Sequence, residues 1–594
     1  MKISRFVSMS VLILALICIS IFQSSYDAAM EELEQQKKTP SQVEDVSFAT
    51  EDVFAENITD NYALYMNDDP YDVITMYLTV RPGNALEGTD HTWEEINRIS
   101  AFDYQDMGVD RYKVAGLLQV GDENGPVFGE LGYGETAPNA TVNIRGQTST
   151  RYRQKNYKIE IKDNKGSFRG QTTIALNKHE QDGIRFRNKL CFDLMTGIDQ
   201  MMSLRTQFVH LYVNDLTDGS DDGFEDYGLY TQVEQLNKTA LKAHGLNKNG
   251  YLYKINFFEF YMYDEMKLVN DPDFDLDAFE EYMEIKGSND NRKLLEMIQD
   301  VNDYSIPIET VIDEHFNMEN LTYWMAFHIL TGNVDTSSRN FYLYSPVNAD
   351  TWYILSWDND GSFMATENDL RGLVDFGGWQ MGVSNYWGNI LFQRCLKSEK
   401  FREALDVAIQ DELAYLTPER ISSMIQGYSK VVKPYVFSGR DALYSPITSQ
   451  QYDEIIAALP YEPQYYYQEY LNSLEKPQPF YMSDITYENG TISLAWDPSY
   501  DFDSENITYT VTVARDYEMK DVIATYQGVW TNLSEKITLD PGGQYFVSVT
   551  ATNESGYSQG AFDFYVANDN YYFGMKSFYL NLDGSVVMDT YVEE

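Results

Sequence analysis

The alternation of apolar and polar residues predicts β-structure in the first part of the chain. Residues 72–80 and 112–120 read as strands, and residues 140–163 predict a β-hairpin, because apolar and polar positions alternate on both sides of a turn. A second hairpin is predicted from residues 207–213 and 227–233. Between the first two strands, Thr92 and Glu95 have the spacing of a capping box and predict a short helix over 92–99.

Helical periodicity dominates after this region. It is present over residues 180–197, from 277 to about 319, in an apolar run that ends at Gly332, and again over 386–475. We therefore expect an α+β fold over residues 69–476, with a β-rich N-terminal part and a helical C-terminal part.

The pattern changes again after a Pro-Gln-Pro linker at 477–479. Residues 480–568 hold about seven short alternating strands separated by turn residues, which predicts an all-β sandwich. With Trp496 early, Tyr545 late and no disulfide, this region resembles a fibronectin type III domain. Residues 569–594 are predicted to form a further hairpin and a tail.

Composition restricts the function. The formal net charge of −48 argues against a nucleic-acid ligand, because the phosphate backbone is bound by clustered Lys and Arg. The three cysteines, Cys18, Cys191 and Cys395, form no CxxC pair, which excludes a cysteine zinc site and a disulfide framework. We expect Cys191 and Cys395 to be buried thiols; one disulfide between them is the alternative.

The N-terminus has the pattern of a secretory signal over residues 1–25. Lys2 and Arg5 precede an apolar run from Val11 to Ile19, which is short for a membrane span. An uncleaved N-terminal anchor is the alternative, and it would be the only membrane contact. Residues 26–68 are predicted to form a polar stalk. We therefore expect a secreted or cell-surface protein.

The first hairpin carries a cluster of cations in an otherwise acidic chain. A solvated strand face would explain them, and so would an anion site for phosphates. They are Arg145, Arg151, Arg153, Lys155, Lys158 and Lys162.

The central stretch, residues 324–363, places four polar residues just after apolar elements. Burying a carboxylate there is costly unless it is paired or bound to a metal. Asp335 and Asn340 are five residues apart, as in the catalytic loop of protein kinases, and Asp358 and Asp360 follow a predicted strand, where kinases place a metal-binding Asp. Oxygen ligands of this kind hold Mg²⁺.

These motifs together resemble the spore coat protein H (CotH) kinase family of atypical protein kinases. The resemblance covers roughly residues 70–475. It rests on HTWEEIN at 91–97, the basic hairpin, YGLYTQVEQLNK at 227–238, GNVDTSSRNFYLY at 332–344, SWDNDGSF at 356–363 and LFQRCLKSEKFREAL at 391–405. It implies a kinase-like fold that transfers the γ-phosphoryl group of ATP to Ser or Thr of proteins, with Mg²⁺ or Mn²⁺.

The resemblance also implies roles for individual residues. Asp335 matches the catalytic Asp. Asn340 and Asp358 match the metal ligands, with Asp360 as a second acid. Lys155 matches the strand lysine most closely; Lys158 is the alternative, and Arg145 is a further phosphate contact. Glu234, within Val233-Glu234-Gln235, is expected near the adenine.

The chain departs from the kinase pattern in three places. No His-Arg precedes Asp335, no Asp-Phe-Gly is present, and no helix Glu that would pair with the lysine is evident; Glu180 and Asp182 are the candidates.

Two functions of different classes follow. The first is an exported protein kinase that acts on secreted or surface proteins. The second is a catalytically silent adhesion or coat-assembly protein, in which the C-terminal sandwich binds a surface polymer or protein. A carboxylate glycosidase fits poorly, because the basic hairpin would have no role.

Overall fold

The computed structural model describes residues 58, 60–66, 68–373, 379–567 and 570–589. By its internal contacts the chain divides into residues 1–55 and 56–594, and all described residues belong to the second unit. The predicted signal segment and nearly all of the predicted stalk lie outside the described residues. Within the described ranges, no helix is both long and apolar enough to cross a membrane.

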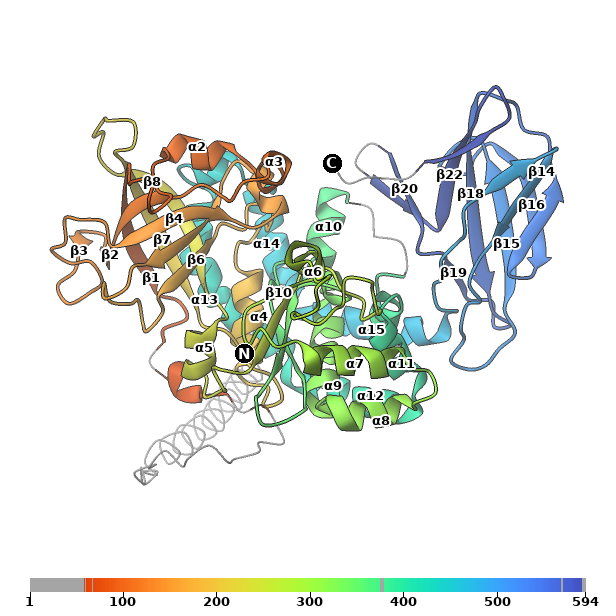
Figure 1. Ribbon diagram of the computed structural model, residues 1–594, viewed down its shortest axis with the longest axis horizontal. Coiled ribbons are helices and arrows are strands. Elements are labelled where there is room, and N and C mark those ends of the chain that lie inside the picture. The colour runs from red at the N-terminus through yellow and green to blue at the C-terminus, as the bar shows by residue number, and fades with distance from the viewer. Residues whose placement is uncertain (1–57, 59, 67, 374–378, 568–569, 590–594) are drawn as a thin grey trace, which may run out of the picture. The chain divides into compact units, whose positions relative to one another are not determined.

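The first part of the described chain is a closed β-barrel. Its strands pair in the order β1-β7-β8-β6-β5-β4-β2, and β1 also pairs with β2, so the sheet has no open edge between them. Only β1 and β7 run parallel. The strands (Figure 1) are β1 (Val73–Arg81), β2 (Val114–Asp122), β4 (Ala140–Arg145), β5 (Asn156–Ile161), β6 (Thr173–Asn177), β7 (Thr206–Asp215) and β8 (Glu225–Glu234), and the short β3 (Gly125–Pro126) pairs with β2.

Side chains fill the barrel interior. Val142 and Ile144 of β4 point inward with Tyr157 and Ile159 of β5, as the predicted alternation of the first hairpin requires. Helices α2 (Trp93–Arg98) and α3 (Ala101–Met107) add apolar side chains to this core. The predicted capping box of α2 is confirmed. Any site facing the helical part must therefore use the outer face of the barrel.

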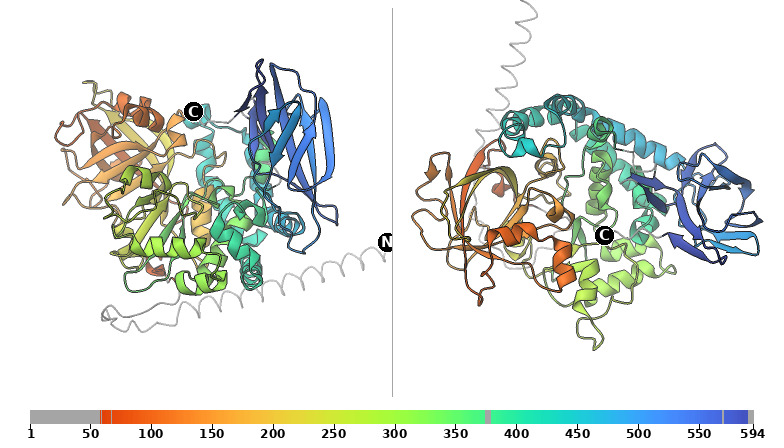
Figure 2. Two further views of the ribbon diagram at one scale, coloured as in Figure 1. Left: turned by 45° about the vertical axis from the view of Figure 1, so that its right-hand side comes forward. Right: turned by 90° about the horizontal axis from the view of Figure 1, so that it is seen from above.

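A helical part follows, built around α9 (Met318–Thr331), which is buried along almost its whole length. α9 packs against α12 and α15 and ends at Gly332 with φ 65°, a left-handed C-cap that favours glycine. The other helices (Figure 2) are α4 (Arg187–Met195), α5 (Lys238–Ala243), α6 (Leu276–Tyr282), α7 (Arg292–Asn302), α8 (Ile308–His315), α10 (Ala365–Arg371), α11 (Ile390–Lys397), α12 (Glu399–Tyr415), α13 (Pro418–Val436), α14 (Ser449–Ala458) and α15 (Glu462–Glu475).

A small sheet joins the helical part. It has the order β10 (Met283–Ile285), β9 (Tyr251–Ile255), β11 (Phe341–Ser345) and β12 (Tyr353–Ser356). One apolar core combines this sheet, the helices and the outward-facing residues Phe208, Leu229 and Val233 of the barrel. The mixed α and β composition predicted for this part of the chain is therefore confirmed. Cys191 and Cys395 are buried free thiols, as expected.

The C-terminal part consists of two sheets around a third core. One sheet has three strands, β13 (Thr486–Glu488), β14 (Thr491–Ala495) and β17 (Asn532–Lys536). The second has the order β16 (Val522–Val529), β15 (Thr508–Ala514), β18 (Gly543–Thr552), β22 (Met575–Leu580) and β23 (Val586–Asp589), with β19 (Ser558–Gly560) beside β18; β20 (Phe564–Ala567) and β21 (Asn570–Phe573) form a separate hairpin.

This sandwich extends beyond the predicted range of 480–568. The strands β22 and β23 form the expected late hairpin, but they also complete the second sheet, because a hairpin alone cannot bury Phe578 and Leu580. Trp496 and Tyr545 lie in the core, and the Tyr545 hydroxyl donates to the Asp540 carbonyl over 2.9 Å. The fibronectin type III assignment stays a prediction.

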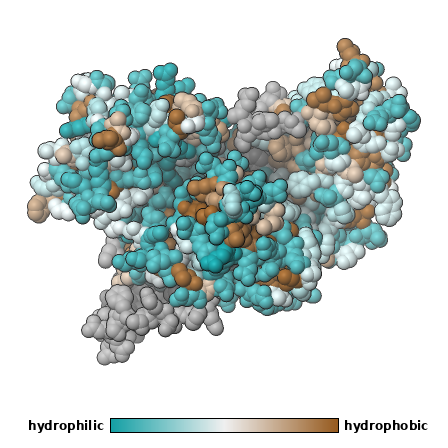
Figure 3. Space-filling model, viewed as in Figure 1, coloured by the Kyte–Doolittle hydropathy of each residue, from teal (hydrophilic) through white to brown (hydrophobic). Residues whose placement is uncertain are grey.

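Hydrophilic side chains cover most of the face of the molecule seen in Figure 3, and apolar residues appear there in small groups. This agrees with the excess of 92 acidic over 44 basic residues in the chain.

Candidate functional site

Two polar residues leave the small sheet at the same end. In the β11–β12 hairpin, Phe341 lies opposite Ser356, and the Trp357 amide donates to the Asn340 carbonyl over 3.1 Å. Asn340 and Asp358, which flank these positions, have φ angles of 61° and 54°. Left-handed backbone interrupts strand geometry, and Asn and Asp tolerate it better than most residues. Asn340 and Asp358 therefore lie just beyond the end of the β11–β12 hydrogen-bonded ladder.

Two side-chain hydrogen bonds fix the backbone of the loop that carries Asp335. The Asn385 amide donates to the Val334 carbonyl over 3.1 Å, and the Asn389 amide donates to the Ser337 carbonyl over 2.9 Å. These bonds satisfy backbone groups of the short helical turn Val334–Thr336. The Asp335 carboxylate points to a different environment: it accepts a hydrogen bond from the exposed Arg339 guanidinium over 3.2 Å.

The Asp335 loop meets the acidic loop after β12 at Gly361. A Cβ atom on Gly361 would lie 3.3 Å from Asn333 Oδ1 and 3.7 Å from Asp335 Oδ2. Asn333 Oδ1 is buried and accepts no hydrogen bond among the described residues. Asp335 and Gly361, 26 positions apart in the sequence, thus lie close together, and the unsatisfied oxygen of Asn333 lies beside them.

His179 and Asn188 hold the acidic loop from the other side. His179 Nδ1 lies 3.2 Å from Asp360 Oδ2, and Asn188 Oδ1 accepts from the Asn359 amide over 3.0 Å. Asn188 Nδ2 in turn lies 3.5 Å from His179 Nε2. Asp360 is therefore oriented by a buried histidine that α4 positions.

A buried group of ion pairs around Arg187 supports this loop. Arg187 Nη1 contacts Asp182 Oδ1 at 2.5 Å and Glu367 Oε2 at 2.7 Å, and its Nε donates to the Phe363 carbonyl over 2.9 Å. Burial disfavours the guanidinium charge, but the Glu367 and Asp182 carboxylates more than offset this and raise the pKa of Arg187. Asp182 is therefore not a partner for a phosphate-binding lysine.

The predicted helix over 180–197 begins later than its sequence pattern suggests. α4 starts at Arg187, and the preceding residues form an irregular loop in which His179 and Arg185 have φ angles of 50° and 65°. Tertiary contacts outweigh helical propensity here, because His179 contacts Asp360 and the Arg185 guanidinium donates to the Lys178 carbonyl over 2.8 Å.

The carboxylates of the acidic loop influence one another. Burial, followed by the charge of Asp360, raises the pKa of Asp358 to about 7, against the opposing effect of His179 and Arg145; Asp335 raises it further. Asp360 behaves in the opposite way: burial acts to raise its pKa, but the hydrogen bond to His179, the charges of His179 and Arg187 and a backbone hydrogen bond together outweigh burial and lower the pKa. The three acids thus share one electrostatic site, in which Asp358 lacks a hydrogen-bond partner among the described residues.

Arg145 brings a positive charge to the same place. It is the last residue of β4, and alternation turns its side chain outward, away from the barrel core. Its Nη1 donates to Asn177 Oδ1, and its guanidinium lies 5.6 Å from the centre of the Trp357 ring. Burial lowers the pKa of Arg145, and the Asp358 charge acts against this. Arg145 is thus a hairpin cation whose charge acts on the acidic loop at Asp358.

The other predicted nucleotide contacts have different surroundings. Lys155 Nζ donates to the Thr150 and Tyr152 carbonyls over 2.5 and 2.7 Å. Lys158 Nζ pairs with Glu160 at 2.8 Å. The Glu234 carboxylate is buried between Arg205, at 2.6 Å, and His244, at 2.8 Å. These contacts occupy the Glu234 side chain, and its backbone amide donates to the Arg205 carbonyl over 2.9 Å, so neither is free for an adenine.

The acids and amides of the site fit a hard divalent cation. Carboxylate and amide oxygens are the ligands that Mg²⁺ prefers, and mutual repulsion among Asp335, Asp358 and Asp360 is relieved by a cation. Asp358 and Asp360 are the acids of this loop that could supply such oxygens, although among the described residues the ligand atoms of Asp335, Asp358 and Asp360 do not all lie within 4.8 Å of one another. Sequence reasoning missed His179, Asn188 and Arg187. None of the three carried a sequence signal; His179 lies two residues after β6, as Asp358 lies two residues after β12, but β6 was not predicted.

The fold and the site together define a mixed α and β protein with an acidic, cation-suited site beside the outer face of a β-barrel. Residues 142–461 match the family model described as CotH kinase protein. This match covers more than half of the 594 residues, so the chain belongs to that family.

Comparison with individual proteins gives two further matches. The inner spore coat protein H of Bacillus subtilis (strain 168) is 22% identical over 301 residues, which is 50% of this chain and 77% of that protein. A solved complex of the Shewanella oneidensis MR-1 toxin–antitoxin system HipA, HipB and its operator DNA matches with a TM-score of 0.24 and 12% identity. That match covers 50% of this chain and only 58% of the other, and it carries no argument at this TM-score.

Proposed function

We propose that this protein transfers the γ-phosphoryl group of ATP to Ser or Thr hydroxyls of other proteins. The observation that carries the proposal is the convergence of Asp335, Asp358 and Asp360 with Arg145 at one site. Phosphoryl transfer depends on positioning and charge neutralisation more than on covalent chemistry. Membership of a family described as kinases supports the same conclusion.

Each acid has its own role in this proposal. Asp335 lies on a rigid loop but has an accessible carboxylate, so it orients the acceptor hydroxyl and takes its proton. Asn340 and Asp358 are the ligands for Mg²⁺ or Mn²⁺, with Asp360, held by His179, as a further oxygen donor. When bound, the cation neutralises the phosphates and the developing charge on the leaving group.

Arg145 and Lys158 are the proposed phosphate contacts. Lys158 lies between Asn143 and Ala175 in strand register, and Arg145 lies one side-chain repeat further along the same outer face of the barrel. A repeat of two residues spans about 6.6 Å, which suits neighbouring phosphates. Lys155 is disfavoured because two backbone carbonyls already hold its ammonium group. Of residues 233–235, Gln235 lies beyond the end of β8, so its backbone remains the proposed adenine contact.

The proposed acceptors are secreted or cell-surface proteins. The N-terminal sequence pattern and the net charge of −48 support a location outside the cytoplasm. The name of the Bacillus subtilis relative, an inner spore coat protein, also supports an extracytoplasmic or coat location.

Labelling with radioactive ATP tests the catalytic assignment. The full chain is incubated with Mg²⁺, labelled ATP and a mixture of extracellular proteins. We expect Asp335→Asn to reduce phosphate incorporation by about 10²- to 10⁴-fold, the usual contribution of a general base, and to retain ATP binding. Asp453→Asn is the matched control, because Asp453 is exposed and pairs only with Lys433 among described residues. Equal labelling by wild type and Asp335→Asn would favour the silent adhesion or coat-assembly protein.

A pair of lysine variants tests the phosphate assignment. We expect Lys158→Met to weaken ATP binding by about tenfold, and Lys155→Met to change it less, because a charge next to a phosphate is worth a charge-assisted contact. Equilibrium binding of a fluorescent ATP analogue measures both. A larger loss in Lys155→Met would restore the assignment favoured by the sequence resemblance.

A further inference from the structure

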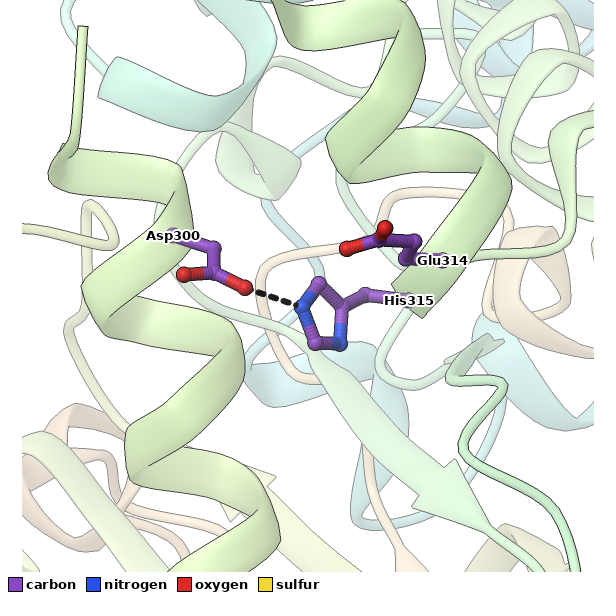
Figure 4. Close-up of side chains that lie close together, drawn as sticks. All are labelled: Asp300, Glu314 and His315. Atoms are coloured by element: carbon purple, nitrogen blue, oxygen red, sulfur yellow. Dashed lines mark hydrogen bonds and ion pairs between the residues drawn. The ribbon is translucent and has the colours of Figure 1, made fainter. Parts of the chain in front are cut away.

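A second group of metal-ligating side chains lies between α7 and α8, which contribute no residue to the site described above. Asp300 comes from α7, and Glu314 and His315 are the last two residues of α8. One ligand atom from each residue lies within 4.8 Å of the other two. In Figure 4 the Asp300 and Glu314 carboxylates both point toward the His315 ring.

We propose that Asp300, Glu314 and His315 bind a divalent transition-metal ion such as Zn²⁺. An imidazole with two carboxylates is a donor set that suits Zn²⁺ and related ions, whereas Mg²⁺ and Ca²⁺ prefer oxygen ligands alone. In a tetrahedral Zn²⁺ site, with bonds of about 2.0 Å, ligand atoms stand roughly 3.3 Å apart. Small side-chain rotations bring the three atoms into that arrangement.

The positions of the three residues are fixed by their backbones. The His315 carbonyl accepts from the Trp352 amide over 2.7 Å, and the Asp300 carbonyl accepts from Arg394 Nη1 over 3.2 Å. His315 Nε2 already lies 2.7 Å from Asp300 Oδ2. Only the side chains must adjust on binding, so the entropic cost of ordering the site is small.

The negative charges of Asp300 and Glu314 favour a bound cation. In the described part of the chain, Glu314 forms no hydrogen bond or ion pair, and the Asp300 carboxylate contacts only His315. His244 shows the opposite case: its two ring nitrogens are taken by different carboxylates, from Asp60 and Glu234, so it has no nitrogen for a metal.

The group is also open to solvent on one side. The His315 side chain is 9% exposed and the Asp300 side chain 29%, while Glu314 is an exposed residue. A metal ion can therefore enter from the Glu314 side, and water can complete its coordination, as in zinc sites with three protein ligands.

Titration of the metal-stripped full chain with ZnCl₂, followed by calorimetry, tests the proposal. We expect Glu314→Gln to weaken Zn²⁺ binding at this site by at least about tenfold without harming the fold, because the exposed Glu314 side chain forms no hydrogen bond or ion pair with any described residue. His315→Ala should abolish the site. His210→Ala is the matched control, since His210 also pairs with an aspartate, Asp226, but with no third ligand.

Co²⁺ in place of Zn²⁺ gives a second readout that does not depend on enzyme activity. Tetrahedral Co²⁺ bound to a histidine absorbs visible light strongly, and the absorption lost in His315→Ala belongs to this site, because His179 beside the acidic loop is unchanged in that variant. We expect the absorption in wild type and His210→Ala, and its loss in His315→Ala. The proposal is overturned if Zn²⁺ affinity is unchanged in Glu314→Gln, or if the Co²⁺ spectrum persists in His315→Ala.

Discussion

Two groups of carboxylates lie near the loop that follows β12, and they differ in whether a positive side chain pairs with them. Asp182 and Glu367 share the fully buried Arg187, so each negative charge has a positive partner within 3 Å. Asp358 has no hydrogen-bond partner in the described part of the chain, and its pKa is raised to about 7 by burial and by Asp360.

The difference separates a structural group from a functional one. A chain that can pair Asp182 and Glu367 so completely leaves Asp358 unpaired only a few residues away. Protein interiors rarely keep an unpaired charge, so the second group is the one prepared to receive a cation.

The largest expected effect comes from breaking the paired group. Arg187→Met leaves Asp182 buried without a counter-charge and leaves Glu367 with Arg371 alone, which costs about 3–5 kcal/mol. Chemical denaturation should show this loss in the free energy of unfolding. A loss below about 1 kcal/mol would mean that the ion pairs do not support the loop.

Asp358→Asn should do the opposite of Arg187→Met: it should lower activity without lowering stability. We expect phosphoryl transfer to fall by about 10²- to 10³-fold, the usual effect of removing one preorganised electrostatic contact. The free energy of unfolding should stay equal or rise, because the variant removes a carboxylate that is repelled by Asp360 and Asp335. Denaturation and labelling of the same protein sample check both, and a large destabilisation would contradict the contrast with Arg187.

His244 provides a pH-dependent test of a second fully paired group. Hydrogen bonds and charges of Asp60 and Glu234 outweigh burial and raise the pKa of His244 from 6.5 to about 9. The stabilisation is complete below pH 6.5 and is lost as the pH rises through about 9, because only the folded state keeps the proton in that window. It amounts to on the order of 3 kcal/mol. Unfolding free energies measured from pH 6 to 9.5 should fall in wild type relative to His244→Gln; parallel curves would refute this.

The smallest expected effect is a rise in thermal stability on addition of Mg²⁺, which should depend on Asp358. At a concentration of about 100 times Kd, a ligand that binds only the folded state adds about 2.7 kcal/mol. We expect a rise in Tm with Mg²⁺ in wild type and in the exposed-site control Asp453→Asn, and almost none in Asp358→Asn. A Tm rise of equal size in Asp358→Asn would place the cation elsewhere.

The sequence predicted the parts of the site that depend on local patterns. The basic hairpin, the Thr92 capping box and the order of Asp335, Asn340 and Asp358 all follow from alternation, spacing and strand ends. The proximity of Asp335 to the loop after β12, at Gly361, was implied by the family resemblance and not by any local signal.

The remaining parts depend on long-range contacts that no local pattern encodes. His179 lies 181 residues from Asp360, and Arg187 lies 180 from Glu367. The helical periodicity of 180–197 also misplaced the start of α4, because those contacts hold residues 178–186 in an irregular loop. The proposed preference for Lys158 over Lys155 likewise depends on contacts that the sequence does not show, since the Thr150 and Tyr152 carbonyls hold the Lys155 ammonium group.

The closure of the barrel by β1 and β2 determines how the protein can be dissected in the laboratory. The family match begins at residue 142, after both strands. A fragment cut at the limits of that match lacks β1 and β2, leaves β7 and β4 with unpaired edges, and opens the core around Val142. Unpaired strand edges promote aggregation. Expression fragments of this protein must therefore start before Val73.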